Sequence, residues 1–168
     1  MNLILFGPPG AGKSFTAVRI IADLLQAGKR IGISSNSHRS INHLLLGTAQ
    51  YCKVLGISAT YVCTSNTEPE LAANGIEISK NEDLYSHIDA SSVIGTTAWG
   101  FAREEMKGRF DYLFIDEAGQ VPVANLIAMS RSARNLVLIG DQMQLSQPTQ
   151  GTHPVESGLS IPVSNTHL

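Results

Sequence analysis

Eight residues near the start of the chain have the types and the spacing that bind phosphate. The stretch GPPGAGKS runs from Gly7 to Ser14 and fits the pattern G-x-x-x-x-G-K-[ST]. Glycines let such a loop turn tightly, so that several backbone N–H groups point at phosphate oxygens. Lys13 adds a cation for the β and γ phosphates, and the Ser14 hydroxyl can ligate Mg²⁺. The sequence therefore predicts a site for ATP and Mg²⁺. The residues predicted to contact the nucleotide here are Gly7, Pro8, Pro9, Gly10, Ala11, Gly12, Lys13, Ser14 and Phe15.

A pair of acids supplies the second part of this chemistry. In YLFIDEAGQ, Asp116 and Glu117 follow an apolar run. Hydrolysis of a metal-bound triphosphate needs a carboxylate near the Mg²⁺ and a base for the attacking water. We expect Asp116 to hold the metal and Glu117 to orient and deprotonate the water. The alternative, two exposed acids at a strand end, is weakened by the phosphate loop in the same chain.

A third polar cluster follows the apolar run in LVLIGDQMQLSQPTQ, residues 136–150. The run stops at Gly140-Asp141, and three glutamines follow within six residues. A glutamine amide can donate to a phosphate oxygen and accept from a neighbour at the same time. These side chains are candidates for sensing the nucleotide, and a polar surface loop is the alternative.

The elements that must position these groups can be read from the hydrophobic pattern. Apolar runs predict strands at residues 2–6, 30–35, 61–64, 91–97, 110–118 and 135–141. Helical spacing predicts helices at residues 13–26, 39–51 and 121–131. Strands that alternate with helices predict an α/β fold with a parallel sheet covered on both faces. Ligands bind such sheets at the carboxyl ends of the strands, where all three clusters lie.

Length and composition limit the class of protein. A chain of 168 residues suits one domain, which we place at residues 1–159 with a possible insertion at 52–91. Charged residues make up 15%, below the roughly 25% of an average domain, which fits a piece that packs against something else. The net charge of −2 provides no strong basic field, which limits a nucleic-acid interpretation without excluding it.

Cysteines and targeting signals exclude other classes. Cys52 and Cys63 are not a C-x-x-C pair, and buried reduced thiols are a better interpretation than a zinc site with His38 and His43. We find no signal peptide and no apolar run approaching about 18 residues. The sequence therefore predicts a cytoplasmic protein with no membrane contact.

Asp116-Glu117-Ala118-Gly119-Gln120 and the stretch from Gly140 to Leu145 resemble motifs II and III of superfamily 1 helicases. The branch with the nonsense-mediated-decay and Okazaki-fragment helicases is the more similar one, and GDQMQLSQPTQGTHP resembles its members fused to RecB-like nucleases. The resemblance implies a RecA-like P-loop NTPase domain driven by ATP along single-stranded DNA or RNA. It also implies that Gln144 touches the γ-phosphate, with Gln120 and Asp141 in the same nucleotide site.

Two further stretches are similar to the strand-contacting motifs of this family. SSNSHRSINHLL, residues 34–45, is similar to motif Ia, with Ser37 and His38 at the contacting positions, although the family often has Ala-Pro where Ser35-Asn36 stand. GTTAW, residues 95–99, is similar to the next such motif, with Thr96 and Thr97 as candidates. Hydroxyl groups hold phosphates without reading sequence. Trp99 is a candidate either for base stacking or for ordinary core packing.

The same resemblance sets expectations about what this chain does alone. The family clamps ATP between two RecA-like domains, and nothing after Pro148 resembles the second, which supplies arginine fingers. We expect residues 160–168 to be a non-native or disordered tail, and the chain to bind ATP with almost no turnover. A fused nuclease domain is a further implied partner.

Three alternatives to a motor domain stay open. One is an ATPase switch that acts on a protein partner. Another is a small-molecule kinase, which would need an acceptor pocket and an arginine-rich lid. The last is a degenerate module that binds nucleotide for structure alone, and the intact Lys13, Ser14, Asp116 and Glu117 argue against it.

Overall fold

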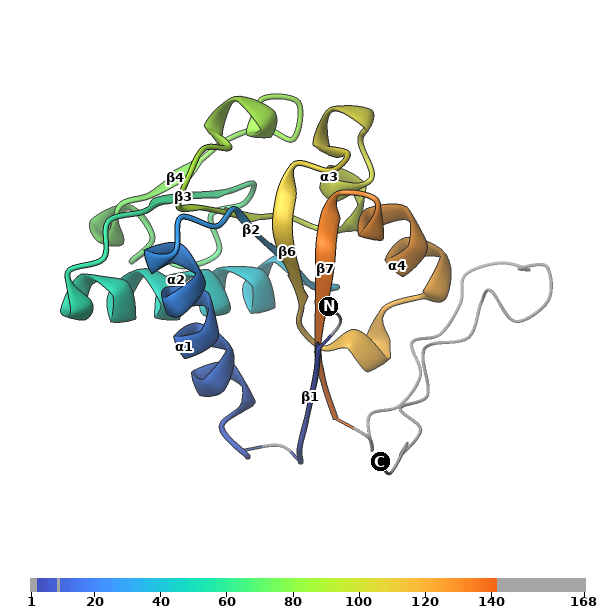
Figure 1. Cartoon of the computed structure of the whole chain (residues 1–168), viewed down its shortest axis with the longest axis horizontal. Helices are drawn as coiled ribbons and strands as arrows, with labels where there is room; N and C mark the ends of the chain where they lie inside the picture. The colour runs from blue at the N-terminus through green and yellow to red at the C-terminus, as the bar shows by residue number, and fades with distance from the viewer. Residues whose placement is uncertain (1–2, 9, 142–168) are drawn as a thin grey trace.

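The computed structural model describes residues 3–8 and 10–141 (Figure 1). Its strands are β1 (Leu3–Phe6), β2 (Ile31–Ser34), β3 (Thr60–Cys63), β4 (Ile76–Ile78), β5 (Ser92–Gly95), β6 (Phe110–Ile115) and β7 (Ala133–Gly140). Its α-helices are α1 (Lys13–Gln26), α2 (His38–Leu55), α3 (Ala98–Phe101) and α4 (Val123–Ser130). Short 3₁₀ turns lie at Ala72–Asn74, Leu84–His87, Glu104–Met106 and Ala118–Gln120. All the strands predicted from apolar runs are present, as are the three predicted helices.

The strands form one sheet in the order β1-β7-β6-β2-β5-β3-β4, and every neighbouring pair is parallel. The carboxyl ends of all these strands therefore lie along one edge. β7 lies between β1, which leads into the phosphate loop, and β6, which leads into the acids. This arrangement confirms the predicted α/β, RecA-like P-loop architecture.

Each face of the sheet has its own hydrophobic core. On one face α1 and α2 pack through Ile21, Leu25, Leu44 and Leu45. On the other face the helical segments after β5 and β6 pack through residues such as Phe101 and Met129. Figure 1 shows α1 and α2 on one side of the sheet and α3 and α4 on the other. Alternate side chains of each strand enter opposite cores, because successive strand residues point to opposite faces.

The helix boundaries follow from local chemistry. Ser37 caps the start of α2 by accepting a hydrogen bond from the Ser40 backbone N–H at 3.1 Å. The helix was predicted to end near Tyr51, but it continues to Leu55 because Cys52 packs into the core. Gly56 then ends it in the left-handed conformation, with φ +70°.

Residues 52–91, the least readable part of the sequence, contribute β3 and β4 to the sheet. β4 forms the edge beyond β3. Cys52 and Cys63 are both buried and form no disulfide with each other. Among the described residues, no helix is long and apolar enough to cross a membrane.

Candidate nucleotide site

The phosphate loop owes its shape to glycines at three positions. Gly10 and Gly12 have φ angles of +78° and +76°, which ordinary side chains rarely adopt. Gly7 is needed for another reason, since a Cβ there would lie 2.9 Å from the Ala11 Cβ. The Ala11 N–H donates to the Pro8 carbonyl at 3.1 Å and closes the turn. The described part of the loop leads directly into α1.

Lys13 folds back over this loop. Its Nζ donates to the Gly7 carbonyl at 2.6 Å and to the Pro8 carbonyl at 2.9 Å. A phosphate placed in the loop would compete with these carbonyl oxygens for the same cation. Ser14 is exposed at the start of α1, where its hydroxyl can reach a metal ion. The donor set of a hydroxyl, an ammonium and the backbone N–H groups at the start of α1 fits a nucleotide phosphate chain.

The two acids sit at the carboxyl end of β6. The Asp116 N–H donates to the Ser34 carbonyl at 2.8 Å, which continues the pairing of β6 with β2. Burial raises the pKa of Asp116, and a bond from the Glu117 N–H to its Oδ1 at 2.9 Å opposes that rise. A half-buried carboxylate that has lost water gains from a nearby cation, so Asp116 suits a metal-binding role.

Glu117 has an unusual backbone and two hydroxyl partners. Its φ of +52° lies in the left-handed region that non-glycine residues seldom occupy. Its Oε2 accepts hydrogen bonds from the Ser40 Oγ at 2.9 Å and from the Ser35 Oγ at 3.2 Å. The acids also border a polar cavity of about 400 Å³. Its lining residues are Arg39, Ser40, His43, Glu68, Asp116 and Glu117.

The other residues predicted to contact the nucleotide lie near these acids or outside the described residues. Gln120 ends the 3₁₀ turn after Glu117, and its carbonyl accepts from the Asn36 side chain. Asp141 is buried just beyond β7, between the strands that lead to the loop and to the acids. Pro9 and Gln144 lie outside the described residues, as do all of residues 142–168.

The predicted strand-contacting residues gather at the same edge, because β2 and β5 are neighbours. Ser37 is exposed, and His38 is half-buried, its Nδ1 lacking a hydrogen-bond partner within the described part of the chain. Thr97 is half-buried before α3. Thr96 is fully buried and donates its hydroxyl to the Asn81 Oδ1 at 2.8 Å, so it does not face solvent.

The structure excludes one of the two alternatives that the sequence left open for Trp99, packing in the core. Its side chain is 80% exposed, so the interpretation as a core residue was wrong. The short helix α3 buries Gly100 and Phe101 instead. The exposed indole beside Thr97 is accessible to a base, and base stacking stays a prediction for this residue.

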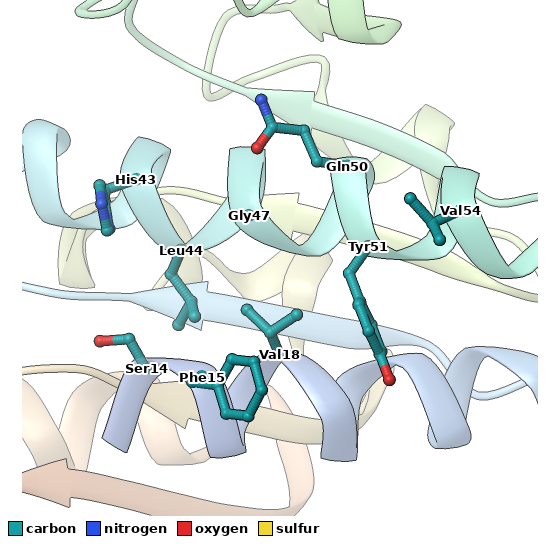
Figure 2. A pocket seen from close by; sticks show the side chains of 9 residues that line it. All are labelled: Ser14, Phe15, Val18, His43, Leu44, Gly47, Gln50, Tyr51 and Val54. Carbon is teal, nitrogen blue, oxygen red and sulfur yellow. The ribbon is translucent and has the colours of Figure 1, made fainter. Parts of the chain in front are cut away.

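A groove between α1 and α2 begins beside the phosphate loop (Figure 2). It has a volume of about 380 Å³. Its lining residues are Ser14, Phe15, Val18, His43, Leu44, Gly47, Gln50, Tyr51 and Val54. The Phe15 ring enters this groove, and the Arg19 guanidinium stacks over it at 3.9 Å. Phe15 therefore faces a space beside the loop and not the loop itself.

Sequence reasoning missed Ser35, Ser40 and His43 as members of the acid site. All three come from the segment after β2. Ser40 and Ser35 are 77 and 82 residues from Glu117 in the chain. The only sequence signal was their place in the stretch that resembles motif Ia. Strand order, which brings β2 beside β6, is what makes the contact.

Comparison with known proteins gives a family and a set of relatives. The family model described as an AAA domain matches residues 64–150. The DNA replication ATP-dependent helicase/nuclease JHS1 of Arabidopsis thaliana is 29% identical, over 94% of this chain and 12% of its own length. The corresponding DNA2 protein of Saccharomyces cerevisiae is 26% identical, over 84% of this chain and 10% of its own. The DNA polymerase alpha-associated DNA helicase A of Schizosaccharomyces pombe is 27% identical, over 90% and 30%. These relatives confirm the resemblance to superfamily 1 helicases.

Proposed function

We propose, from the premise that this chain belongs to the AAA domain family, that it is an ATP-driven motor domain acting on single-stranded nucleic acid. The chain spans only 12% and 10% of the two helicase/nucleases reported above, so the activity of a whole protein is an inference here. DNA is the favoured strand, because those relatives are named as DNA replication enzymes. RNA is the second candidate.

One observation carries the proposal: the phosphate loop, the acids and the strand-contact candidates all follow carboxyl ends of a single parallel sheet. Nucleotide and strand would then bind along one edge, with β6 and β2 as direct neighbours. A movement of Asp116 and Glu117 can therefore be passed from β6 directly to β2, which leads to the residues proposed to contact nucleic acid. A kinase or a structural nucleotide module has no need of this arrangement.

On the nucleotide side, the loop N–H groups and Lys13 would hold the phosphates, and Ser14 and Asp116 would hold Mg²⁺. When bound, the metal would neutralise phosphate charge. Glu117 would accept a proton from water as the water oxygen bonds to the γ-phosphorus and the bond to the ADP oxygen breaks. Gln120 ends the turn after Glu117, and Asp141 follows β7, the strand between those of the loop and of the acids, so both would report the state of the nucleotide.

On the strand side, Ser37, His38 and Thr97 would hold the backbone through hydroxyl, imidazole and backbone N–H groups, without reading bases. Thr96 would hold the backbone of Thr97 in place and not contact the nucleic acid, since its own hydroxyl is bonded to Asn81. Trp99 would stack on a base. The switch that acts on a protein partner is the less favoured function, because the relatives are named helicases.

The first test is a titration of the purified chain with a fluorescent ATP analogue, with and without Mg²⁺. We expect metal-dependent binding that weakens at least about tenfold in Lys13→Ala, since a charged hydrogen bond to phosphate is worth about 1.5–3 kcal/mol. Lys80→Ala removes an equal charge from an exposed position away from the loop and serves as the control. Equal binding by Lys13→Ala and the parent would reject the site.

The second test asks whether nucleotide and strand are coupled. Binding of labelled oligo-dT and oligo-U is measured with and without Mg²⁺ and the ATP analogue. A motor requires that nucleotide change the affinity for the strand, and linkage requires the reverse effect of equal size. A chain that binds the analogue but no strand, or binds a strand without coupling, would favour the protein switch.

A further inference from the structure

The helices α1 and α2 run in the same direction along one face of the sheet, because each of them connects two parallel strands. They approach each other at Gly47, where a Cβ would lie 3.5 Å from the Val18 Cγ2. Ser14 lies one turn before Val18 in α1, and His43 lies one turn before Gly47 in α2. This register places His43 opposite Ser14, and Figure 2 shows both residues at the same end of the groove.

His43 also belongs to the surroundings of the two acids. It follows Ser40 by one turn of α2, and the Ser40 hydroxyl donates to the Glu117 Oε2 at 2.9 Å. The polar cavity that Asp116 and Glu117 border has His43 in its lining. Burial raises the pKa of Asp116, and the nearby His43 acts against that rise. His43 therefore lines both this cavity and the groove that begins beside the phosphate loop.

The His43 side chain is exposed, and within residues 3–8 and 10–141 it forms no hydrogen bond and no ion pair. Ser40, one turn earlier, is by contrast already bonded to Glu117. An imidazole carries at least one N–H donor whether it is neutral or charged. His43 thus offers a donor to a ligand that enters between α1 and the acids, and it needs no change of charge to do so.

The proposed function brings two groups to this place, Mg²⁺ and the γ-phosphate of ATP. Mg²⁺ takes oxygen ligands, whereas imidazole suits zinc, copper, iron or nickel, so His43 is a poor magnesium ligand. A phosphate oxygen is a strong acceptor for an N–H donor. The backbone of a phosphate loop holds the α and β phosphates, which leaves the γ-phosphate as the part of the nucleotide that reaches the acids.

We propose that His43 donates a hydrogen bond to the γ-phosphate of bound ATP and so helps the site to distinguish ATP from ADP. The inference rests on the proposed function and adds a residue of α2 to the nucleotide site. The same helix begins at His38, directly after Ser37, and both are candidates for contact with nucleic acid. A γ-phosphate bound by His43 would therefore connect the nucleotide to the element that carries these two residues.

The test compares the affinity of the 168-residue chain for fluorescent Mg·ADP with its affinity for a fluorescent, non-hydrolysable Mg·ATP analogue. We expect His43→Ala to weaken binding of the ATP analogue about fivefold to tenfold, the loss of one hydrogen bond to phosphate. The affinity for ADP should stay at the parent value, because ADP has no γ-phosphate. His43→Gln keeps an N–H donor and should retain most of the affinity for the ATP analogue.

Gln50→Ala is the matched control, because Gln50 is also exposed on α2 and lines the far end of the same groove. This variant should leave both affinities unchanged. Comparable circular dichroism and melting of each variant establish that it is folded. Equal weakening of ADP and of the ATP analogue in His43→Ala would indicate a general disturbance of the phosphate loop and would reject the inference.

The outcomes separate the role of His43 from the proposed function. A parent whose binding of the ATP analogue requires Mg²⁺ and Lys13, with the same affinity in His43→Ala, rejects the contact to the γ-phosphate and leaves the motor proposal standing. A parent with no metal-dependent nucleotide binding rejects both proposals together.

Discussion

At the scale of single residues, Gly12 matters to the site through its backbone and not through contacts. Its φ is +76°, and a Cβ built there would meet no atom within 4 Å. Gly28, after α1, has φ +74° and equally open surroundings. The two positions therefore share one conformational requirement, but only Gly12 belongs to the phosphate loop.

We predict that Gly12→Ala and Gly28→Ala each lower the free energy of unfolding by about 1 kcal/mol, since both force alanine into the left-handed region. Only Gly12→Ala should also weaken binding of the Mg²⁺-loaded ATP analogue. Urea unfolding and the fluorescence titration measure the two effects. Equal nucleotide binding by the two variants would show that the loop tolerates a change of backbone shape.

Residue types at the site could be predicted from the sequence, but their partners could not. Lys13, Asp116 and Glu117 are identifiable because each follows a strand and matches a chemical requirement. The bonds from Ser35 and Ser40 to Glu117 depend on β2 lying beside β6. A pattern of apolar residues gives each strand separately and says nothing about their order.

At the scale of elements, Arg30 and Asp111 join the amino-terminal ends of β2 and β6. Arg30 donates to the Asp111 carboxylate from Nε, Nη2 and its backbone N–H at 2.9–3.1 Å. These bonds hold the pKa of Asp111 below its ordinary value. The pair therefore fixes the register of two central strands at the edge opposite the site.

We predict that Asp111→Asn costs about 1 kcal/mol of unfolding free energy at pH 7. Because the folded pKa is lowered, the contribution is complete above the unfolded pKa of about 4 and disappears as the pH falls through the folded pKa. Urea unfolding of parent and variant between pH 2 and pH 7 measures this difference. A difference that stays constant over that range would show that charge plays no part. The exposed pair of Arg103 and Glu105 offers a control, Glu105→Gln, with a smaller expected effect.

The packing of α2 on the sheet depends on a glycine of β5. A Cβ at Gly95 would lie 2.7 Å from the Ile41 Cγ2, whereas at Gly47, within α2, the nearest atom would be the Val18 Cγ2 at 3.5 Å. We predict that Gly95→Ala destabilises the fold by about 1–3 kcal/mol through overpacking. Gly47→Ala should stabilise it by up to about 1 kcal/mol, because alanine favours a helix. Thermal melting distinguishes the two, and a stable Gly95→Ala chain would mean that α2 can shift freely.

The sequence predicted α1 and most of α2 well, because both have a clear helical period and a glycine just beyond the end. β4 escaped prediction, since it has three residues and only Ile76 of them is buried. Such a strand exists because β3 offers it a free edge, which is a property of the assembled sheet. The sequence could not decide between base stacking and core packing for Trp99 for a similar reason, because the neighbours of α3 decide which of its residues are buried.

At the scale of the whole molecule, the resemblance to two-domain motors predicts that the 168-residue chain binds Mg·ATP but turns it over slowly. Arginine fingers raise the rate of related NTPases by about 10³–10⁵, and the family takes them from its second RecA-like domain. Single-turnover phosphate release measures the rate of the chain alone. Adding the second domain from a relative should accelerate it if the two can dock.

Fast phosphate release by the chain alone would contradict this prediction. Arg39 would then be the candidate for an arginine finger within this chain. This arginine borders the cavity of Asp116 and Glu117, its side chain is 84% exposed, and among the described residues its ion pair is with Glu68 at 4.0 Å. Loss of a fast rate in Arg39→Ala, with nucleotide affinity unchanged, would place the finger within this chain. Retention of that rate would assign the charge stabilisation to Lys13 and the bound metal. In the expected case of slow turnover, Arg39→Ala leaves the rate unchanged, as expected where a second domain supplies the arginine finger.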